Sequence, residues 1–328
     1  MSVCIILCLI GIAISFVFSL GIGSVHYSWQ QVLDALRTNS GDENPIHTII
    51  WQLRTPRAIE ALIIGAGLAI AGVDIQALVR NPLAEPYLLG IAAGASVGAT
   101  AVLVFGVFSG LYALCFGSLI GAIIASITVY AIARMHGDLD PLRLILSGVV
   151  LSAAFSAIAS FLVFRGPDAR AAESVMFWML GSVAGASWAK IPIALFIALG
   201  ALIILFILGP KMDAIASGDD TAYSLGVDPH RMRIVLFIIQ AVLVGTMVAI
   251  AGGIGFVGLV IPHLARHIVG GVHRRLLPVA AVMGALFLLW VDIIARIAAP
   301  PQEIPLGVVT GIIGAPLFLL LMGRRRNG

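Results

Sequence analysis

Long apolar segments alternate with short polar ones along the whole chain. A transmembrane helix needs about 20 predominantly apolar residues, and ten segments meet or approach that length. The ten segments are approximately residues 3–23, 57–79, 88–107, 112–134, 143–164, 191–210, 232–254, 256–270, 276–297 and 304–323. The pattern therefore predicts an all-α integral membrane protein with about ten transmembrane helices.

Glycine and proline interrupt two of these segments, 88–107 and 256–270. A backbone break at membrane depth is tolerated only where other protein or a water-filled cavity covers it. Such breaks occur along transport paths, and they also occur as simple packing kinks. Both interpretations of the two segments stay open at this point.

Composition supports the membrane assignment. Of the 328 residues, 60% are hydrophobic and 11% are charged, and the mean hydropathy is +1.10. An ordinary soluble domain has about 25% charged residues. The polar stretches are too short to form a soluble domain, so we expect one membrane domain over residues 1–328. The first segment lacks the basic start of a secretory signal and is expected to remain as the first helix.

Lysine and arginine are distributed unevenly between alternate loops, and cytoplasmic loops carry an excess of these residues. With ten helices and a cytoplasmic N-terminus, twelve of them fall inside, namely Arg80, Arg134, Arg143, Lys211, Arg231, Arg233, Arg266, Arg274, Arg275, Arg324, Arg325 and Arg326. Seven fall outside, namely Arg37, Arg54, Arg57, Arg165, Arg170, Lys190 and Arg296. The excess predicts a multi-pass protein of the cytoplasmic membrane with both termini in the cytoplasm.

Small residues recur at a spacing that suits helix packing. Glycines four residues apart are Gly90, Gly94 and Gly98, then Gly117 and Gly121, and finally Gly307 and Gly311. In lipid, helices associate where small residues let their backbones approach. We expect tight packing inside one subunit, with a subunit interface or a pore lining as the alternative.

A weak internal repeat is also present. Ala69-Ile-Ala-Gly72 lies ten residues before Pro82, and Ala249-Ile-Ala-Gly252 lies ten residues before Pro262. Under the ten-helix count the two copies cross the membrane in opposite directions. Inverted repeats of this kind are typical of transporters.

Several motifs together resemble one known family. They are Arg54-Thr-Pro-Arg57, Gln76 with Arg80-Asn-Pro-Leu-Ala-Glu-Pro86, Gly90 with Gly94-Ala, Trp178-Met-Leu-Gly-Ser182, Leu225-Gly226, Gly255-Phe-Val-Gly-Leu-Val-Ile-Pro-His263, Ile304-Pro-Leu-Gly-Val-Val-Thr310 and Gly314-Ala-Pro316. In this order, and over essentially the whole chain, they resemble the FecCD-type permease subunits of type II ABC importers for ferric siderophores, haem and vitamin B12.

The resemblance implies an inverted-repeat permease fold and a homodimer of ten-helix subunits, with the translocation path along the dimer axis. It also implies two cytoplasmic ATPase subunits and one extracytoplasmic binding protein as partners, besides the lipid bilayer. The expected cargo is an iron chelate, either a ferric siderophore or haem, with vitamin B12 as the alternative.

The sequence contains no ATP-binding loop. Its only lysines are Lys190 and Lys211, and neither lies in the G-x-x-x-x-G-K-[ST] pattern that holds ATP phosphates. We therefore expect ATP and Mg²⁺ to bind the partner subunits. We expect no catalytic residue, cofactor, metal site or nucleic-acid site in this chain.

Arg54 and Arg57 flank Pro56 at the expected outer end of the second helix. Guanidinium groups at a membrane surface pair with carboxylates of a soluble partner, or they lie among lipid headgroups. The family resemblance favours docking of the binding protein at these two residues and at Arg296. Arg296 also follows Asp292 by four residues, so an ion pair within one helix competes with docking.

The polar loop from Asp213 to Arg233 is the longest expected cytoplasmic connection. We expect two short helices, 212–217 and 219–225, joined at Gly218 and ended by Gly226. The resemblance implies that this coupling loop, residues 212–233, binds the ATPase subunits. The expected contact residues are Ile215, Ala216, Ser217, Gly218, Ala222, Tyr223, Leu225 and Gly226.

The resemblance also places a cytoplasmic gate at Asp140, Pro141 and Leu142, at the start of the fifth helix. Relatives have small hydroxylated residues there, whereas this chain has an acidic residue, a proline and a leucine. An ordinary turn is the alternative.

Glu60 and Asp74 are carboxylates inside an expected membrane helix, where ionisable residues are rare and often functional. A proton relay through them would make the protein an ion-coupled secondary transporter. Glu60 lies one turn from Arg57, so a simple ion pair is the preferred interpretation. His263 and His267 are four residues apart, and we expect them to belong to a basic helix end, not to a metal site.

Overall fold

The computed structural model describes residues 1–23, 25, 27–37, 45–110, 112–135, 139–166, 169–300 and 302–323. Every regular element in these ranges is a helix. In chain order the elements are α1 (Ser2–Gly21), α2 (Trp29–Arg37), α3 (Pro45–Thr48), the π-helix η1 (Ile49–Arg54), α4 (Thr55–Leu78), the 3₁₀-helix η2 (Pro86–Leu89), α5 (Ile91–Phe105), α6 (Ala113–Arg134), α7 (Pro141–Phe164), α8 (Ala169–Met179), α9 (Ile191–Ala216), α10 (Asp219–Ser224), α11 (Pro229–Ala251), α12 (Val257–Val269), α13 (His273–Ile297) and α14 (Leu306–Gly323).

All ten predicted transmembrane segments are helical. Within the described ranges, seven helical stretches are long and apolar enough to cross a membrane, and α5, α12 and α14 are shorter apolar helices. Two of the short helices, α5 and α12, are the segments in which glycine and proline predicted a break. Gly90 precedes α5 with φ 73°, and Phe256 precedes α12 with φ 67°.

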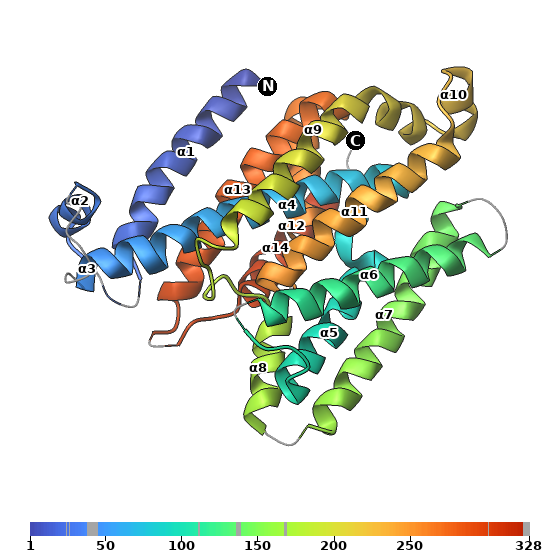
Figure 1. Cartoon of the computed structure of the whole chain (residues 1–328). Helices are drawn as coiled ribbons and strands as arrows, with labels where there is room; N and C mark the ends of the chain where they lie inside the picture. Colours follow the sequence, from blue (N-terminus) through green and yellow to red (C-terminus); the bar gives the residue numbers. More distant parts are fainter. Residues whose placement is uncertain are drawn as a thin grey trace.

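Helix α4 lies at the centre of the structure, between α9, α11 and α13 (Figure 1). Its residues from Ala61 to Leu78 are almost all buried, whereas only four residues of α1 and four of α7 are buried. The outer helices therefore cover α4 and expose their own apolar side chains. Phe164 of α7, for example, is 85% exposed.

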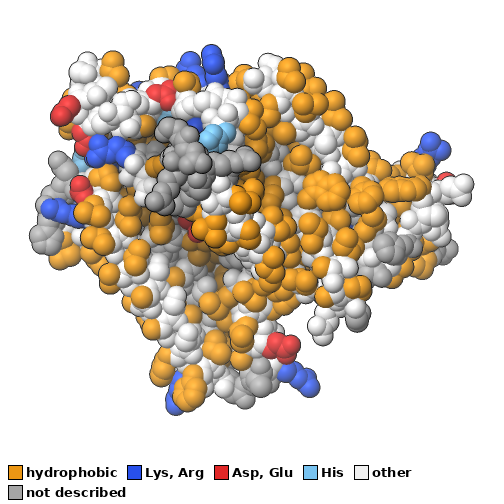
Figure 2. Space-filling view, turned by 180° about the vertical axis from the view of Figure 1, so that it is seen from behind, with side chains coloured by type: hydrophobic (Ala, Val, Ile, Leu, Met, Phe, Trp, Pro, Cys, Tyr) orange, Lys and Arg blue, Asp and Glu red, His pale blue; other side chains and the backbone are white. Residues whose placement is uncertain are grey.

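Hydrophobic side chains cover much of the surface, and the charged side chains gather at its edges (Figure 2). Soluble monomers rarely expose apolar patches larger than a few hundred Å². A surface of this kind suits contact with lipid, as the composition predicts.

The molecule has two polar ends, which we name by their residues. The arginine end contains Arg54 and Arg57 where α4 begins. The α10 end contains Asp219, which pairs with Arg80 after α4 and with Arg233 in α11. Helices α4 and α11 therefore run in opposite directions, as the internal repeat predicts.

Glycines bring helix backbones into direct contact. A Cβ atom added to Gly72 of α4 would lie 1.9 Å from the carbonyl oxygen of Gly258 in α12. A Cβ atom added to Gly98 of α5 would lie 1.9 Å from the carbonyl oxygen of Gly117 in α6. The spaced glycines of α5 and α6 thus pack inside one subunit, as predicted.

The segment between α11 and α12 is held by side chains from the loop after α4. The N–H of Phe256 donates to Glu85 at 2.7 Å. The hydroxyl of Tyr87 donates to the carbonyl oxygen of Ile254 at 3.0 Å and accepts from the N–H of Ile254 at 2.9 Å. A positive φ at a bulky residue costs about 1–3 kcal/mol, and such residues persist where their surroundings fix them. Glu85 supplies that contact for Phe256.

The prediction of a separate helix over 212–217 is wrong. Helix α9 continues through Pro210 as far as Ala216, so this stretch is its last part. The end of α9 is fixed to α13, because Asp213 accepts from the backbone N–H of His273 at 3.0 Å. Burial and this tertiary contact outweigh the proline, which sequence rules place at helix boundaries.

We expect Gly72→Ala to lower the thermal stability of the purified protein, because the added methyl group collides with the backbone of Gly258. Overpacking of this kind lowers the free energy of unfolding by about 1–3 kcal/mol. Gly200→Ala is the matched control, since a Cβ there meets nothing within 4 Å. Equal melting temperatures for the two variants in detergent would contradict the close contact of α4 with α12.

Candidate functional site

A buried carboxylate, Asp292 on α13, holds two arginines at the arginine end. Its Oδ1 accepts from Nε of Arg57 at 2.8 Å, and its Oδ2 lies 3.1 Å from Nε of Arg296. Arg57 also donates to Glu303, before α14, at 2.8 Å. The structure contains the pair of Asp292 and Arg296 that the sequence offered as an alternative to docking, and Arg57 joins it from α4.

Arg54 and Arg296 bind the C-terminal end of α1. The last carbonyl groups of a helix have no partner inside that helix. Arg54 donates to the carbonyl oxygen of Leu20 in α1 at 2.6 Å and to that of Val25, in the segment after α1, at 2.5 Å. Arg296 makes two further bonds of 3.1 and 3.0 Å to carbonyl oxygens at the same helix end. The two arginines therefore fix α1 to η1 and α13.

The structure brings the three predicted docking residues together and gives each an internal partner. Arg54 and Arg296 are only 8% and 5% exposed, and the Arg57 side chain is 12% exposed. Removing one partner of a buried ion pair lowers the folding stability by about 3–5 kcal/mol. Glu303, whose side chain is 32% exposed, is the accessible member of the network. Docking at the three arginines stays a prediction.

Nothing in the sequence pointed to Glu303, because 246 residues separate it from Arg57. The predicted ion pair between Glu60 and Arg57 is wrong, since Arg57 bonds to Asp292 and Glu303. Glu60 is instead buried within the bundle.

Asp74, the second carboxylate of α4, is also fully buried. With its amide turned to donate, Gln240 of α11 lies 3.2 Å from Oδ2 of Asp74. A hydrogen bond between helices thus partly satisfies this carboxyl group, and it ties α4 to α11.

At the opposite end, Asp219 begins α10 and binds the arginines that follow α4 and begin α11. Arg80 lies 3.3 Å away, and Arg233 donates to the same carboxylate oxygen. Gly218 with φ 116° precedes α10, and Gly226 with φ 74° follows it. Glycine adopts these positive φ values without the cost of a Cβ atom. The predicted joint at Gly218 and stop at Gly226 are confirmed.

The eight predicted coupling residues differ in burial. Ile215 and Ala222 are 1% and 0% exposed and pack inside the chain. Tyr223 and Leu225 are 60% and 65% exposed, so they form the apolar surface of the α10 end. The remaining predicted residues around them, Ala216, Ser217, Gly218 and Gly226, are exposed or half-buried.

Asp140 acts as the N-cap of α7. Its carboxylate accepts from the backbone N–H groups of Leu142 and Arg143 at 2.9 and 3.1 Å. Pro141 occupies the first turn, where its missing N–H costs nothing. This arrangement gives the residues of the predicted gate a local structural role, and the gate itself stays a prediction.

His263 and His267 lie side by side on α12, with their Nε2 atoms 3.2 Å apart. In the described part of the chain, no group of three or more His, Cys, Asp or Glu side chains could hold a metal ion.

The chain matches proteins of known families along almost its full length. The sequence model of the FecCD transport family matches residues 11–324. The Fe(3+)-citrate import system permease protein YfmE of Bacillus subtilis is 39% identical over 308 residues, covering 93% of this chain and 90% of that protein. The vitamin B12 import system permease protein BtuC of Vibrio cholerae is 40% identical over 282 residues, covering 85% and 84%.

A solved structure agrees with these sequence matches. It is described as an inward-facing conformation of a metal-chelate type ABC transporter, and it superposes with a TM-score of 0.85 at 34% identity, covering 98% of each chain. Fold, apolar helices and sequence lead to one assignment, and the chain is a multi-pass membrane protein that belongs to the FecCD transport family.

Proposed function

We propose that the chain is the membrane-spanning permease subunit of an ATP-driven importer for an iron chelate, either a ferric siderophore or haem. The observation that carries the proposal is full-length similarity to permeases of iron import. Besides the Fe(3+)-citrate permease, a probable siderophore transport system permease of Bacillus subtilis is 38% identical over 98% of this chain.

In this proposal an extracytoplasmic binding protein delivers the chelate at the arginine end. Arg57 is the natural contact, because its internal partner Glu303 is accessible and a carboxylate of the binding protein can replace it. Arg54 and Arg296 add positive charge while they hold the end of α1 in place. Charge complementarity of this kind sets the orientation and rate of docking.

Two cytoplasmic ATPase subunits bind the α10 end, where Tyr223 and Leu225 supply an exposed apolar contact. Asp219 at the start of α10 is bonded to Arg80 and Arg233. A movement of α10 would therefore reach the ends of α4 and α11, the two helices of the inverted repeat. ATP and Mg²⁺ belong to the ATPase subunits, and this chain contributes no cofactor.

The proposed gate, Asp140 to Leu142, belongs at the same end of the molecule. The neighbouring Leu139 N–H lies 3.3 Å from Nδ1 of His230 in α11. A shift of α11 would act directly on this loop.

We further propose that two copies form a homodimer and that both termini are cytoplasmic. The exposed apolar side chains of α7, α8 and α14 offer a surface for a second copy. The orientation is supported by α1, whose C-terminal end is bound at the arginine end and whose start therefore lies toward the α10 end.

Vitamin B12 is the second candidate cargo, favoured by the similarity to the permease of Vibrio cholerae. Uptake into proteoliposomes separates the candidates. With the ATPase inside and the binding protein outside, we expect ATP-dependent accumulation of radiolabelled iron chelate. Accumulation of cobalamin and no iron chelate would favour the second candidate. Uptake driven by a proton gradient without ATPase subunits would instead support a relay through Glu60 and Asp74.

We expect the double variant Arg54→Glu and Arg57→Glu to bind the binding protein at least about tenfold more weakly, because like charges then face each other. Binding-protein-stimulated ATPase activity is the measurement. Arg165→Glu is the control, since Arg165 is an exposed cation outside this network. The melting temperature of each variant separates lost docking from lost contacts to α1. Wild-type stimulation in the double variant would exclude docking at these residues.

Leu225→Asp should release the ATPase subunits, because it places a charge in the proposed apolar contact while the side chain stays exposed in the free chain. Burying a leucine side chain is worth about 1.5–3 kcal/mol, so we expect at least about tenfold weaker association. Ser224→Asp is the control, because it adds the same charge one residue away from the proposed apolar contact. Co-purification that is unchanged in Leu225→Asp would show that the ATPase binds elsewhere.

A further inference from the structure

Three cavities lie in a row along α6, α9 and α11, and we call them together the α6 groove. The largest, about 660 Å³, has apolar walls that include Ile127 and Phe237. It shares Leu119 with a narrow cavity of about 120 Å³. That cavity shares Cys115 and Lys190 with a third of about 480 Å³ near α8. The shared lining residues place the three cavities next to one another along α6.

The polar atoms in the apolar part of the groove are already bonded. The hydroxyl groups of Ser126 and Thr246 donate to carbonyl oxygens one turn earlier in their own helices, both at 2.8 Å. At the far end, the hydroxyl of Tyr130 accepts from Arg134 at 2.9 Å. This part of the groove therefore suits an occupant without hydrogen-bonding groups.

The groove opens to the membrane and extends across it. Ile123 and Ile238 on its walls are 48% and 55% exposed on the apolar surface. Its lining on α6 runs from Tyr112 to Tyr130, which at 1.5 Å per residue is about 27 Å. The hydrocarbon core of a bilayer is about 30 Å thick. One acyl chain spans about half of this thickness, so the groove is long enough to hold it.

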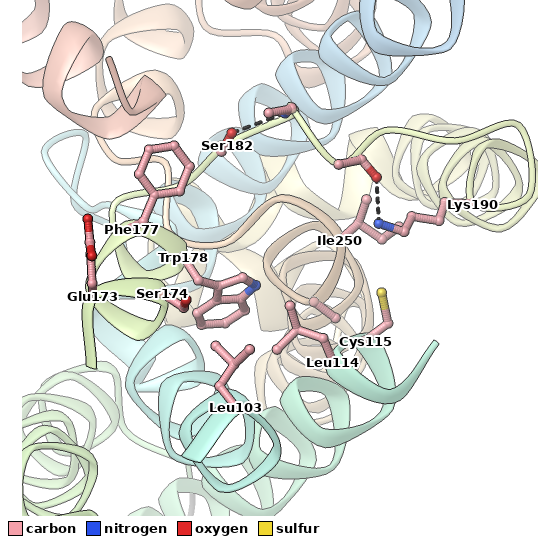
Figure 3. A pocket seen from close by; sticks show the side chains of 13 residues that line it. Leu103, Leu114, Cys115, Glu173, Ser174, Phe177, Trp178, Ser182, Lys190 and Ile250 are labelled. Atoms are coloured by element: carbon pink, nitrogen blue, oxygen red, sulfur yellow. Dashed lines mark hydrogen bonds between the residues drawn. The ribbon is translucent and has the colours of Figure 1, made fainter. Parts of the chain in front are cut away.

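The chamber near α8 has apolar walls and also polar side chains, which include Glu173 and, on the opposite side of the view, Lys190 (Figure 3). Nζ of Lys190 donates to the carbonyl oxygen of Gly185 at 2.8 Å, which leaves two of its three protons for another acceptor. The indole Nε1 of Trp178 is buried and has no hydrogen-bond partner among the described residues. Two donors thus line the chamber, one of them positively charged.

Two tryptophans indicate that this chamber lies at the headgroup level of a bilayer. Trp51 and Trp188 stack at 6.4 Å on the same side of the molecule as Lys190. Tryptophan is enriched at membrane–water interfaces, where its ring lies among the headgroups. Lys190 therefore lies where the phosphate groups of lipids are.

We propose that the α6 groove binds one phospholipid, with an acyl chain along α6 and α11 and its phosphate on Lys190. Lipid tails are as apolar as the groove, so the apolar walls alone give little preference over bulk lipid. The charge of Lys190 supplies the preference, because a basic side chain near the membrane surface attracts lipid phosphate. Free inorganic phosphate has no chain for the groove and binds only weakly.

Native mass spectrometry of the protein, extracted from nanodiscs of phosphatidylethanolamine and phosphatidylglycerol, tests the proposal. We expect about one retained phospholipid per chain in the wild type, and about fivefold less in Lys190→Gln. Lys211→Gln is the matched control, since it removes the only other lysine of the chain. Ala241→Phe, which narrows the groove, should also reduce retention, and Lys190→Arg should preserve it.

Equal retention in Lys190→Gln and the wild type would overturn the proposal, as would equal loss in Lys211→Gln. Binding of inorganic phosphate with no retained lipid would show that only an anion site exists and would also overturn the proposal. Lys190→Arg is the control for misfolding. A correctly folded variant that keeps the positive charge must also keep the lipid.

Discussion

Lipid offers no hydrogen bonds, so a membrane protein must satisfy its backbone polar groups internally. The breaks between helices show how this chain meets that requirement. Arg54 and Arg296 bind the open carbonyl end of α1, and Glu85 and Tyr87 bind the backbone between α11 and α12. These side chains come from distant parts of the sequence. The same contacts that satisfy the backbone also hold the helices together.

Helix α4 connects these contacts into one body. Its glycines allow close approach of α12, and Arg57 at its start joins Asp292 of α13. Beyond its other end, Arg80 joins Asp219 at α10. A buried helix fixed at both ends to neighbouring elements is a direct mechanical link across the membrane. The proposed import, with cargo received at one end and ATPase action at the other, needs such a link.

The charged groups of the two ends differ in exposure, and this difference suits two kinds of partner. The arginine end presents a network of buried ion pairs with one accessible carboxylate, Glu303, which an acidic partner can replace. The α10 end presents the apolar side chains of Tyr223 and Leu225. Electrostatic docking is fast and reversible, whereas apolar contacts sustain a stable assembly.

The sequence alone predicted the ten apolar helices, the two interrupted helices, the opposed repeat and the stop at Gly226, and it offered the ion pair of Asp292 with Arg296 as one of two interpretations. Each follows from local rules of hydrophobic length, backbone freedom or spacing along one helix. The tertiary structure decided the rest. It turned Arg57 away from Glu60 to Asp292 and Glu303, and it buried Ala222 while exposing Leu225. Such choices depend on which distant helices meet, and spacing along the chain carries no information about that.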